Sequence, residues 1–147
     1  MLFPAGLLIT AVLLWCGMAW LQQRLIAQRS GWSALAQRFG HPDSPPPGRP
    51  RIVRATCVIG EATLTNSLAL VIDADTLWAI PRFVPRWLPV LAIPRTAFDD
   101  VAVIERQGMT VVTCEVAGQR WQISAGGEFS RSPFWRAAES AADGPAR

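Results

Sequence analysis

The chain has 147 residues, half of them hydrophobic and 17% charged, which allows one domain plus one further element and excludes a two-domain enzyme. Its 14 basic residues, all arginine, face 11 acidic residues; Arg24, Arg29 and Arg38 lie within residues 1–40, which contain no acid. The remainder of the chain is neutral and lacks the basic face that a nucleic-acid-binding domain needs.

The first predicted element is a transmembrane helix over residues 1–22. Leu2 to Leu21 contains no charged residue, and a helix of that length spans about 30 Å, the thickness of the hydrocarbon core. A cleaved signal peptide would show a basic residue before the apolar run and a small-residue cleavage site after it, and neither is present. We therefore expect an uncleaved, single-pass membrane anchor.

The juxtamembrane arginines predict the orientation of this anchor. Arg24, Arg29 and Arg38 all follow the span within about 20 residues, and basic residues stay on the cytoplasmic side. We expect the N-terminus outside, the C-terminal domain in the cytoplasm and its cysteines reduced. The alternative is a domain facing the envelope, with a disulfide between Cys57 and Cys114.

Residues 23–40 predict an amphipathic neck helix, with Ser30 as a plausible N-cap. Its apolar stripe consists of Trp32, Leu35, Ala36 and Phe39. The stripe can lie on the membrane surface or pack on the following domain, and we favour the domain.

Residues 41–50 contain five prolines, which disfavours both helix and strand. This segment predicts a stiff, polyproline-like linker, so that the soluble domain covers residues 51–147.

Residues 51–147 alternate apolar and polar side chains with period 2, which predicts a β-rich domain. We expect a strand over 53–59, a turn at Gly60-Glu61, a second strand over 64–72 and, after a turn at 73–75, a third strand that carries Trp78 and Ile80.

Three antiparallel strands are expected next, over 101–106, 109–116 and 121–125, with turns at Gln107-Gly108 and Ala117-Gly118. Ser132 followed by Pro133 then begins a closing helix that ends near Ala142, and its buried side consists of Phe134, Trp135 and Ala138. The fold class is α+β: one transmembrane helix, an antiparallel β-rich domain and a C-terminal helix.

Several short segments resemble a family of small, largely uncharacterised bacterial inner-membrane proteins with a single span. They are the membrane helix, Ser30 to Phe39, the proline-rich gap, a strand pair ending in Asp73-Ala74-Asp75-Thr76-Leu77, and Leu91-Ala92-Ile93-Pro94. This resemblance implies a soluble part similar to the pleckstrin-homology and GRAM-like fold. It implies no reaction.

Residues 81–94 form the most unusual stretch, with four prolines, two aromatic residues and no acid from Thr76 to Phe98. Apolar tips beside arginines suit a membrane interface or a groove on a membrane protein. The candidate contact surface consists of Arg82, Phe83, Arg86 and Trp87. The alternative is a lid on the β core in which Trp87 and Leu91 are buried.

No catalytic, cofactor-binding or metal-ligating residue is predicted. The close carboxylate pairs Asp73/Asp75 and Asp99/Asp100 stand at turns or strand starts, where aspartate is common. Cys57 and Cys114 lie on apolar strand faces, and the chain contains no phosphate-binding, dinucleotide-binding or zinc motif. We expect a non-enzymatic binding or scaffold module that contacts a membrane protein or anionic lipid, with a small tethered enzyme as the alternative. The residues indicate no particular partner and no oligomeric state.

Overall fold

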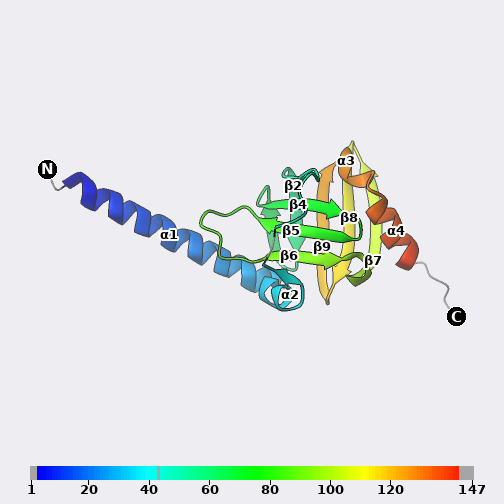
Figure 1. Ribbon diagram of the computed structural model, residues 1–147, viewed down its shortest axis with the longest axis horizontal. Helices are drawn as coiled ribbons and strands as arrows, with labels where there is room; N and C mark the ends of the chain where they lie inside the picture. Colours follow the sequence, from blue (N-terminus) through cyan, green and yellow to red (C-terminus); the bar gives the residue numbers. More distant parts are fainter. Residues whose placement is uncertain (1–2, 43, 143–147) are drawn as a thin grey trace.

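The computed structural model describes residues 3–42 and 44–142, which form a long helix joined to a domain of two antiparallel sheets (Figure 1). Helix α1 (Phe3–Ser30) has 28 residues and is about 42 Å long. Its part Ala5–Ser30 is long and apolar enough to cross a membrane. Met1 and Leu2 of the predicted span, Asp43 of the predicted linker and residues 143–147 lie outside the described residues.

The predicted neck over residues 23–40 consists of two helical pieces. Its first part, residues 23–30, contains no glycine or proline and continues α1. At Gly31 a positive φ of 67° then turns the chain into α2 (Trp32–Phe39). The predicted N-cap Ser30 is wrong by one residue: Gly31 is the N-cap of α2, and Ser30 is the last residue of α1. The Ser30 hydroxyl accepts a hydrogen bond from the backbone N–H of Trp32 (3.2 Å). Trp32 and Leu35 are 0% and 1% exposed, so the stripe packs on the domain.

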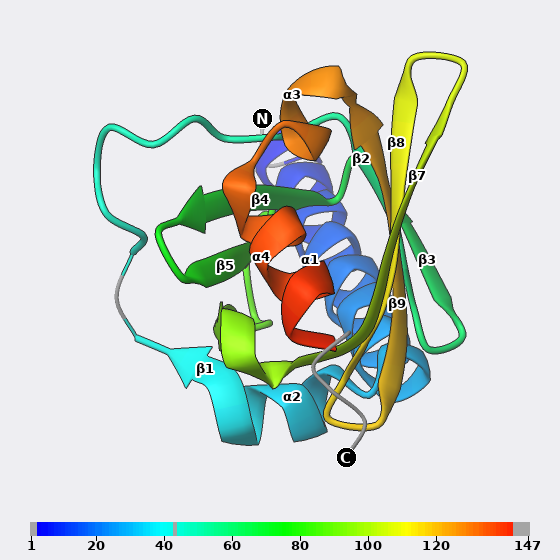
Figure 2. The ribbon, with the colours of Figure 1, turned by 90° about the vertical axis from the view of Figure 1, so that its right-hand side faces the viewer.

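The proline-rich segment lies on the domain. It begins with β1 (Gly40–His41), which pairs with strand β6, and the His41 ring meets the Trp78 ring edge-on at 5.0 Å. Further along, Arg49 forms an ion pair with Asp73 (2.9 Å). Figure 2 shows residues 44–54 passing along the outer side of β4 and β5. The folded unit therefore extends N-terminal to residue 51 and includes α2.

The first sheet has the strand order β1-β6-β5-β4. It consists of β1, β4 (Leu68–Asp73), β5 (Thr76–Pro81) and β6 (Val90–Pro94). The expected hairpin of β4 and β5 is confirmed, with Ala74 at a φ of 41° in its turn. Both faces of this sheet are covered: one faces the main core, and the other carries the cluster Ala69, Val71, Trp78, Ile80 and Val90.

The second sheet has the strand order β3-β2-β9-β8-β7. Its strands are β2 (Ala55–Ile59), β3 (Ala62–Thr65), β7 (Phe98–Arg106), β8 (Met109–Val116) and β9 (Gln119–Gly126). The expected meander of three strands, β7 to β9, is confirmed, and both its turns have two consecutive residues with positive φ. A short 3-10 helix, η1 (Arg95–Ala97), joins the sheets.

The predicted single strand over 64–72 is wrong. Asn66 has a φ of 54° and breaks the strand, so that β3 belongs to the second sheet and β4 to the first. The break directs the chain from one sheet to the other and creates the space that the main core fills.

Two C-terminal helices follow β9: α3 (Gly127–Ser130) and α4 (Pro133–Ala142). Figure 2 shows α4 between the two sheets, at the end of the domain that faces away from α1. Phe134, Trp135 and Ala138 are buried, as expected, and the rings of Phe134 and Trp135 both meet Phe98 edge-on. The Ser132 hydroxyl accepts a hydrogen bond from the Phe134 N–H (3.3 Å), so the predicted helix start is confirmed.

Because Trp32 is buried, its substitution tests whether α2 belongs to the folded unit. We expect Trp32→Ala in the full chain to lower the free energy of unfolding by about 3–5 kcal/mol, because it empties a large volume in the core. The matched control is Ser33→Ala, at the exposed neighbouring position, with an expected change below about 0.5 kcal/mol. Denaturant unfolding in detergent measures both, and equal stabilities would contradict the packing of α2 in the core.

Candidate functional site

Residues 82–89, here called the β5–β6 loop, extend away from the sheets along α1 (Figure 1). Two side chains of α1 hold the outer part of this loop. The Trp15 indole N–H donates a hydrogen bond to the Val84 carbonyl oxygen (3.3 Å), and the Gln23 amide N–H donates to the Pro85 carbonyl oxygen (2.8 Å). The loop is therefore fixed beside the apolar part of the helix.

Gln23 is the centre of this attachment. It is only 2% exposed, and its side-chain oxygen accepts hydrogen bonds from the backbone N–H groups of Trp87 (2.9 Å) and Leu88 (3.3 Å). One side chain thus satisfies three backbone groups of the loop. The Trp32 indole N–H donates a further hydrogen bond to this loop, to the Pro89 carbonyl oxygen (3.1 Å).

All four predicted contact residues lie on this loop. Arg82, Arg86 and Trp87 are exposed, with Trp87 46% exposed, whereas Phe83 is half-buried against the main core. The alternative that buries Trp87 in a lid is wrong, because the loop projects past the core; Leu91 is buried, but within β6.

The three juxtamembrane arginines are exposed but differ in their surroundings. The guanidinium of Arg24 lies 5.1 Å from the centre of the Trp20 ring on α1, and that of Arg38 lies 5.5 Å from the Phe39 ring on α2. The backbone carbonyl of Arg29 accepts a hydrogen bond from the Glu61 N–H (3.0 Å), which joins the end of α1 to the β2–β3 turn.

A groove of about 780 Å³ is lined by both α1 and the tip of the loop. Trp15 and Met18 line it from the helix, and Phe83 and Val84 line it from the loop. Val84 is 76% exposed, next to the exposed apolar side chains of Trp15 and Met18. The groove and Val84 form an apolar surface beside the helix that is suited to a membrane.

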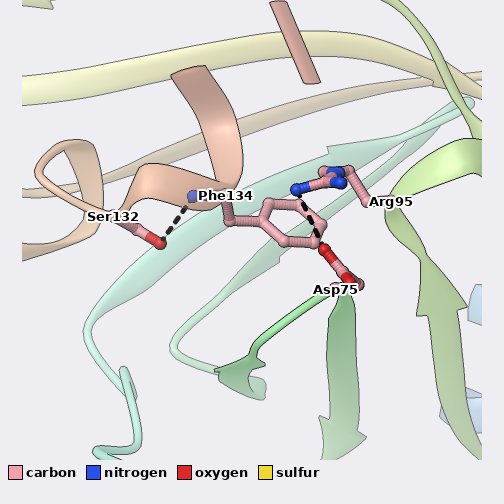
Figure 3. Close-up of polar contacts among 4 residues, drawn as sticks. All are labelled: Asp75, Arg95, Ser132 and Phe134. Carbon is pink, nitrogen blue, oxygen red and sulfur yellow. Dashed lines mark hydrogen bonds and ion pairs between the residues drawn. The ribbon is translucent and has the colours of Figure 1, made fainter. Parts of the chain in front are cut away.

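The members of the two close carboxylate pairs have different surroundings. Asp73 pairs with Arg49, and Asp75 pairs with Arg95 at 2.9 Å, a contact that Figure 3 shows beside the start of α4. Asp99 and Asp100 are exposed at the start of β7. Within residues 3–42 and 44–142, no group of three or more His, Cys, Asp or Glu could hold a metal ion.

Cys57 and Cys114 are buried free thiols. Burial raises the pKa of each to about 12, so neither supplies a thiolate nucleophile at neutral pH. Cys57 lies on β2 and Cys114 on β8, with β9 between them; Cys57 pairs with Ile123 and Cys114 with Trp121, so their separation exceeds the roughly 9.5 Å of two strand spacings. A disulfide needs Cα atoms closer than about 7 Å, so the alternative Cys57–Cys114 disulfide does not fit this sheet.

Gln23 is the residue that the sequence analysis missed. It follows an uncharged run and precedes Arg24, a place where glutamine commonly faces water or lipid headgroups. Its role depends on carbonyl and N–H groups more than 60 residues away, for which the sequence carries no local signal.

Comparisons with protein-family models, with curated proteins and with solved structures find no match to this chain. The geometry of the β5–β6 loop and its attachment to α1 therefore carries the functional argument.

The role of Gln23 can be tested against its exposed neighbour Gln22. We expect Gln23→Leu to release the loop, because three backbone groups lose their hydrogen-bond partner; the Leu88 N–H is buried, and its loss alone costs roughly 1–3 kcal/mol. Trypsin should then cleave after Arg86 at least tenfold faster in detergent, and the Trp87 and Leu88 amides should exchange faster. Gln22→Leu is the matched control. Equal cleavage rates in both variants would contradict the inference that the Gln23 side chain holds the β5–β6 loop, an attachment called here the Gln23 clamp.

Proposed function

We propose that this protein is a single-span module of the bacterial inner membrane with its N-terminus outside and its domain in the cytoplasm. In this proposal it is a non-enzymatic binding module whose β5–β6 loop contacts the anionic cytoplasmic leaflet. The observation that carries the proposal is the attachment of that loop to α1 beside Trp15, within the apolar run of the helix.

The position of the attachment supports insertion of the loop tip. Trp15 precedes Leu21, the end of the apolar run, by six residues, and Arg24 by nine, which correspond to about 9 Å and 13.5 Å along the helix. With the end of the apolar run at the boundary of the hydrocarbon core, the Val84 carbonyl group that Trp15 binds lies inside the core. Backbone polar groups are tolerated there when other groups satisfy them, as Trp15 and Gln23 do for this loop.

The charges of the loop support an anionic surface. Of the three arginines between Thr76 and Phe98, Arg95 is paired with Asp75, whereas Arg82 and Arg86 are exposed beside the loop tip. Each arginine near an anionic membrane surface contributes about 1 kcal/mol to binding. Trp87 suits the same depth, because its ring is amphipathic.

We further propose that the domain is similar to the pleckstrin-homology fold. Two features support this similarity. If β3 and β4 are counted as one strand interrupted at Asn66, β2–β9 amount to seven strands. The helix α4 follows the last strand and closes the space between the sheets. The β2–β3 turn is not open for a ligand, since a side-chain atom added at Gly60 would lie 2.9 Å from the Arg29 carbonyl oxygen. A contact with the membrane through the β5–β6 loop therefore fits better than a headgroup pocket at that turn.

Reporter fusions after Arg147 test the orientation. We expect a green fluorescent protein fusion to be bright and an alkaline phosphatase fusion to be inactive, because phosphatase needs the oxidising exterior to fold. As a control, an added second membrane span before the reporter should reverse both signals. High phosphatase activity without the added span would refute a cytoplasmic domain.

The contact with the leaflet is tested by a fluorophore attached at Val84→Cys in the full-length protein carrying Cys16→Ser, in vesicles that contain phosphatidylglycerol. We expect blue-shifted emission, quenching by lipids brominated on their acyl chains and protection from iodide. The matched control is Glu105→Cys, an exposed position on β7, which should show the opposite pattern. Equal iodide quenching at both positions would refute the contact.

A further inference from the structure

We propose that the groove between α1 and the β5–β6 loop binds one anionic phospholipid, with an acyl chain along the helix and its phosphate at Arg82. The inference rests on the proposed function, because it places the groove in the cytoplasmic leaflet. It goes further by naming a ligand class and a defined site. The groove volume of about 780 Å³ falls within the range of about 300–1,000 Å³ typical of ligand pockets.

The helix side of the groove is a single stripe of α1. Its lining residues are spaced by three, four, seven, eight and eleven positions, which places them on one face: Ala11, Leu14, Trp15, Met18, Ala19 and Gln22. Ala11 and Ala19 keep the groove open. The Trp15 N–H is already bonded to the loop, so the ring contributes an apolar wall.

The length of this stripe matches one leaflet. From Ala11 to Gln22 the helix rises about 16.5 Å, close to half of the 30 Å hydrocarbon thickness. A transmembrane helix of a partner would find a matching wall along only half of its span. An acyl chain of the cytoplasmic leaflet finds one along its whole length.

The polarity of the groove runs in the direction that a phospholipid requires. Its deep end is apolar, and its end nearest the domain carries Gln22 and Arg82. One nitrogen of the Arg82 guanidinium donates to the Asn66 carbonyl oxygen (3.2 Å), which orients the group, and a guanidinium has five N–H donors in all. Arginine binds phosphate through paired hydrogen bonds, and its positive charge favours a lipid whose phosphate charge is not balanced by an ammonium group in the headgroup.

The test is native mass spectrometry of the full-length protein in detergent with equimolar phosphatidylglycerol and phosphatidylcholine. We expect one retained lipid and about a tenfold preference for phosphatidylglycerol, because the choline ammonium of phosphatidylcholine balances the phosphate charge at Arg82. Arg82→Gln should remove that preference. Arg106→Gln, an equal change of charge at the end of β7, should leave it intact.

Variants that fill the groove separate this site from lipids bound elsewhere on the helix. We expect Ala19→Trp to abolish the retained lipid and Leu13→Trp, on the opposite face of α1, to keep it. Should Ala19→Trp unfold the protein, Ala11→Trp at the exposed deep end of the groove replaces it. Retention of phosphatidylglycerol by a folded groove-filling variant would overturn the proposal, as would cross-linking of a photoreactive residue at Met18 mainly to protein.

The fluorophore at Val84→Cys distinguishes the two proposals. In the Ala19→Trp background its signal should still report contact with the bilayer while the retained lipid is lost. Water exposure of Val84→Cys in the unfilled protein would refute the proposed function itself. Bilayer contact with no preference for phosphatidylglycerol would refute only the lipid site.

Discussion

The attachment of the β5–β6 loop to α1 depends on the carboxamide of Gln23. A glutamine side chain offers both donors and an acceptor, and here a single buried group satisfies the carbonyl of Pro85 and the N–H groups of Trp87 and Leu88. A buried polar side chain is costly unless it is paired, so the clamp and the loop require each other. Together with the hydrogen bond from the Trp32 indole N–H to the Pro89 carbonyl oxygen, the Gln23 clamp connects α1, α2 and the first sheet.

These contacts set the direction of α1 relative to the domain. The hydrogen bond from the Glu61 N–H to the Arg29 carbonyl fixes the end of the helix against the second sheet, and the Gln23 clamp fixes it against the first. Gly31 then turns the chain sharply, where a side chain would strain the backbone and meet Gln119 at 2.8 Å. Between α1 and the sheets there is consequently no free linker, and the proline-rich segment 41–50 lies after this junction.

The sequence predicts those elements that depend only on a few neighbouring residues. The turns at Gln107-Gly108 and Ala117-Gly118 and the Ser132-Pro133 helix start are such cases, and the structure has all three. The break at Asn66 could not be predicted from periodicity, because the interruption Asn66-Ser67 has two residues and leaves the alternation of Leu64 and Leu68 in phase. The candidate loop was found from its composition, but Gln23 and the groove depend on residues far apart in the chain.

The rigidity of this junction bears on how the protein can use its loop. A loop on a flexible tether pays conformational entropy when it binds, whereas Pro85 and Pro89 restrict this one and Gln23 holds it in place before any contact forms. In the proposed orientation, insertion of α1 brings Val84 and Trp87 to the leaflet at no further ordering cost. In the proposed function, α1 supplies the membrane affinity that Arg82, Arg86 and Trp87 are too few to supply alone, and Arg82 selects the lipid in the groove.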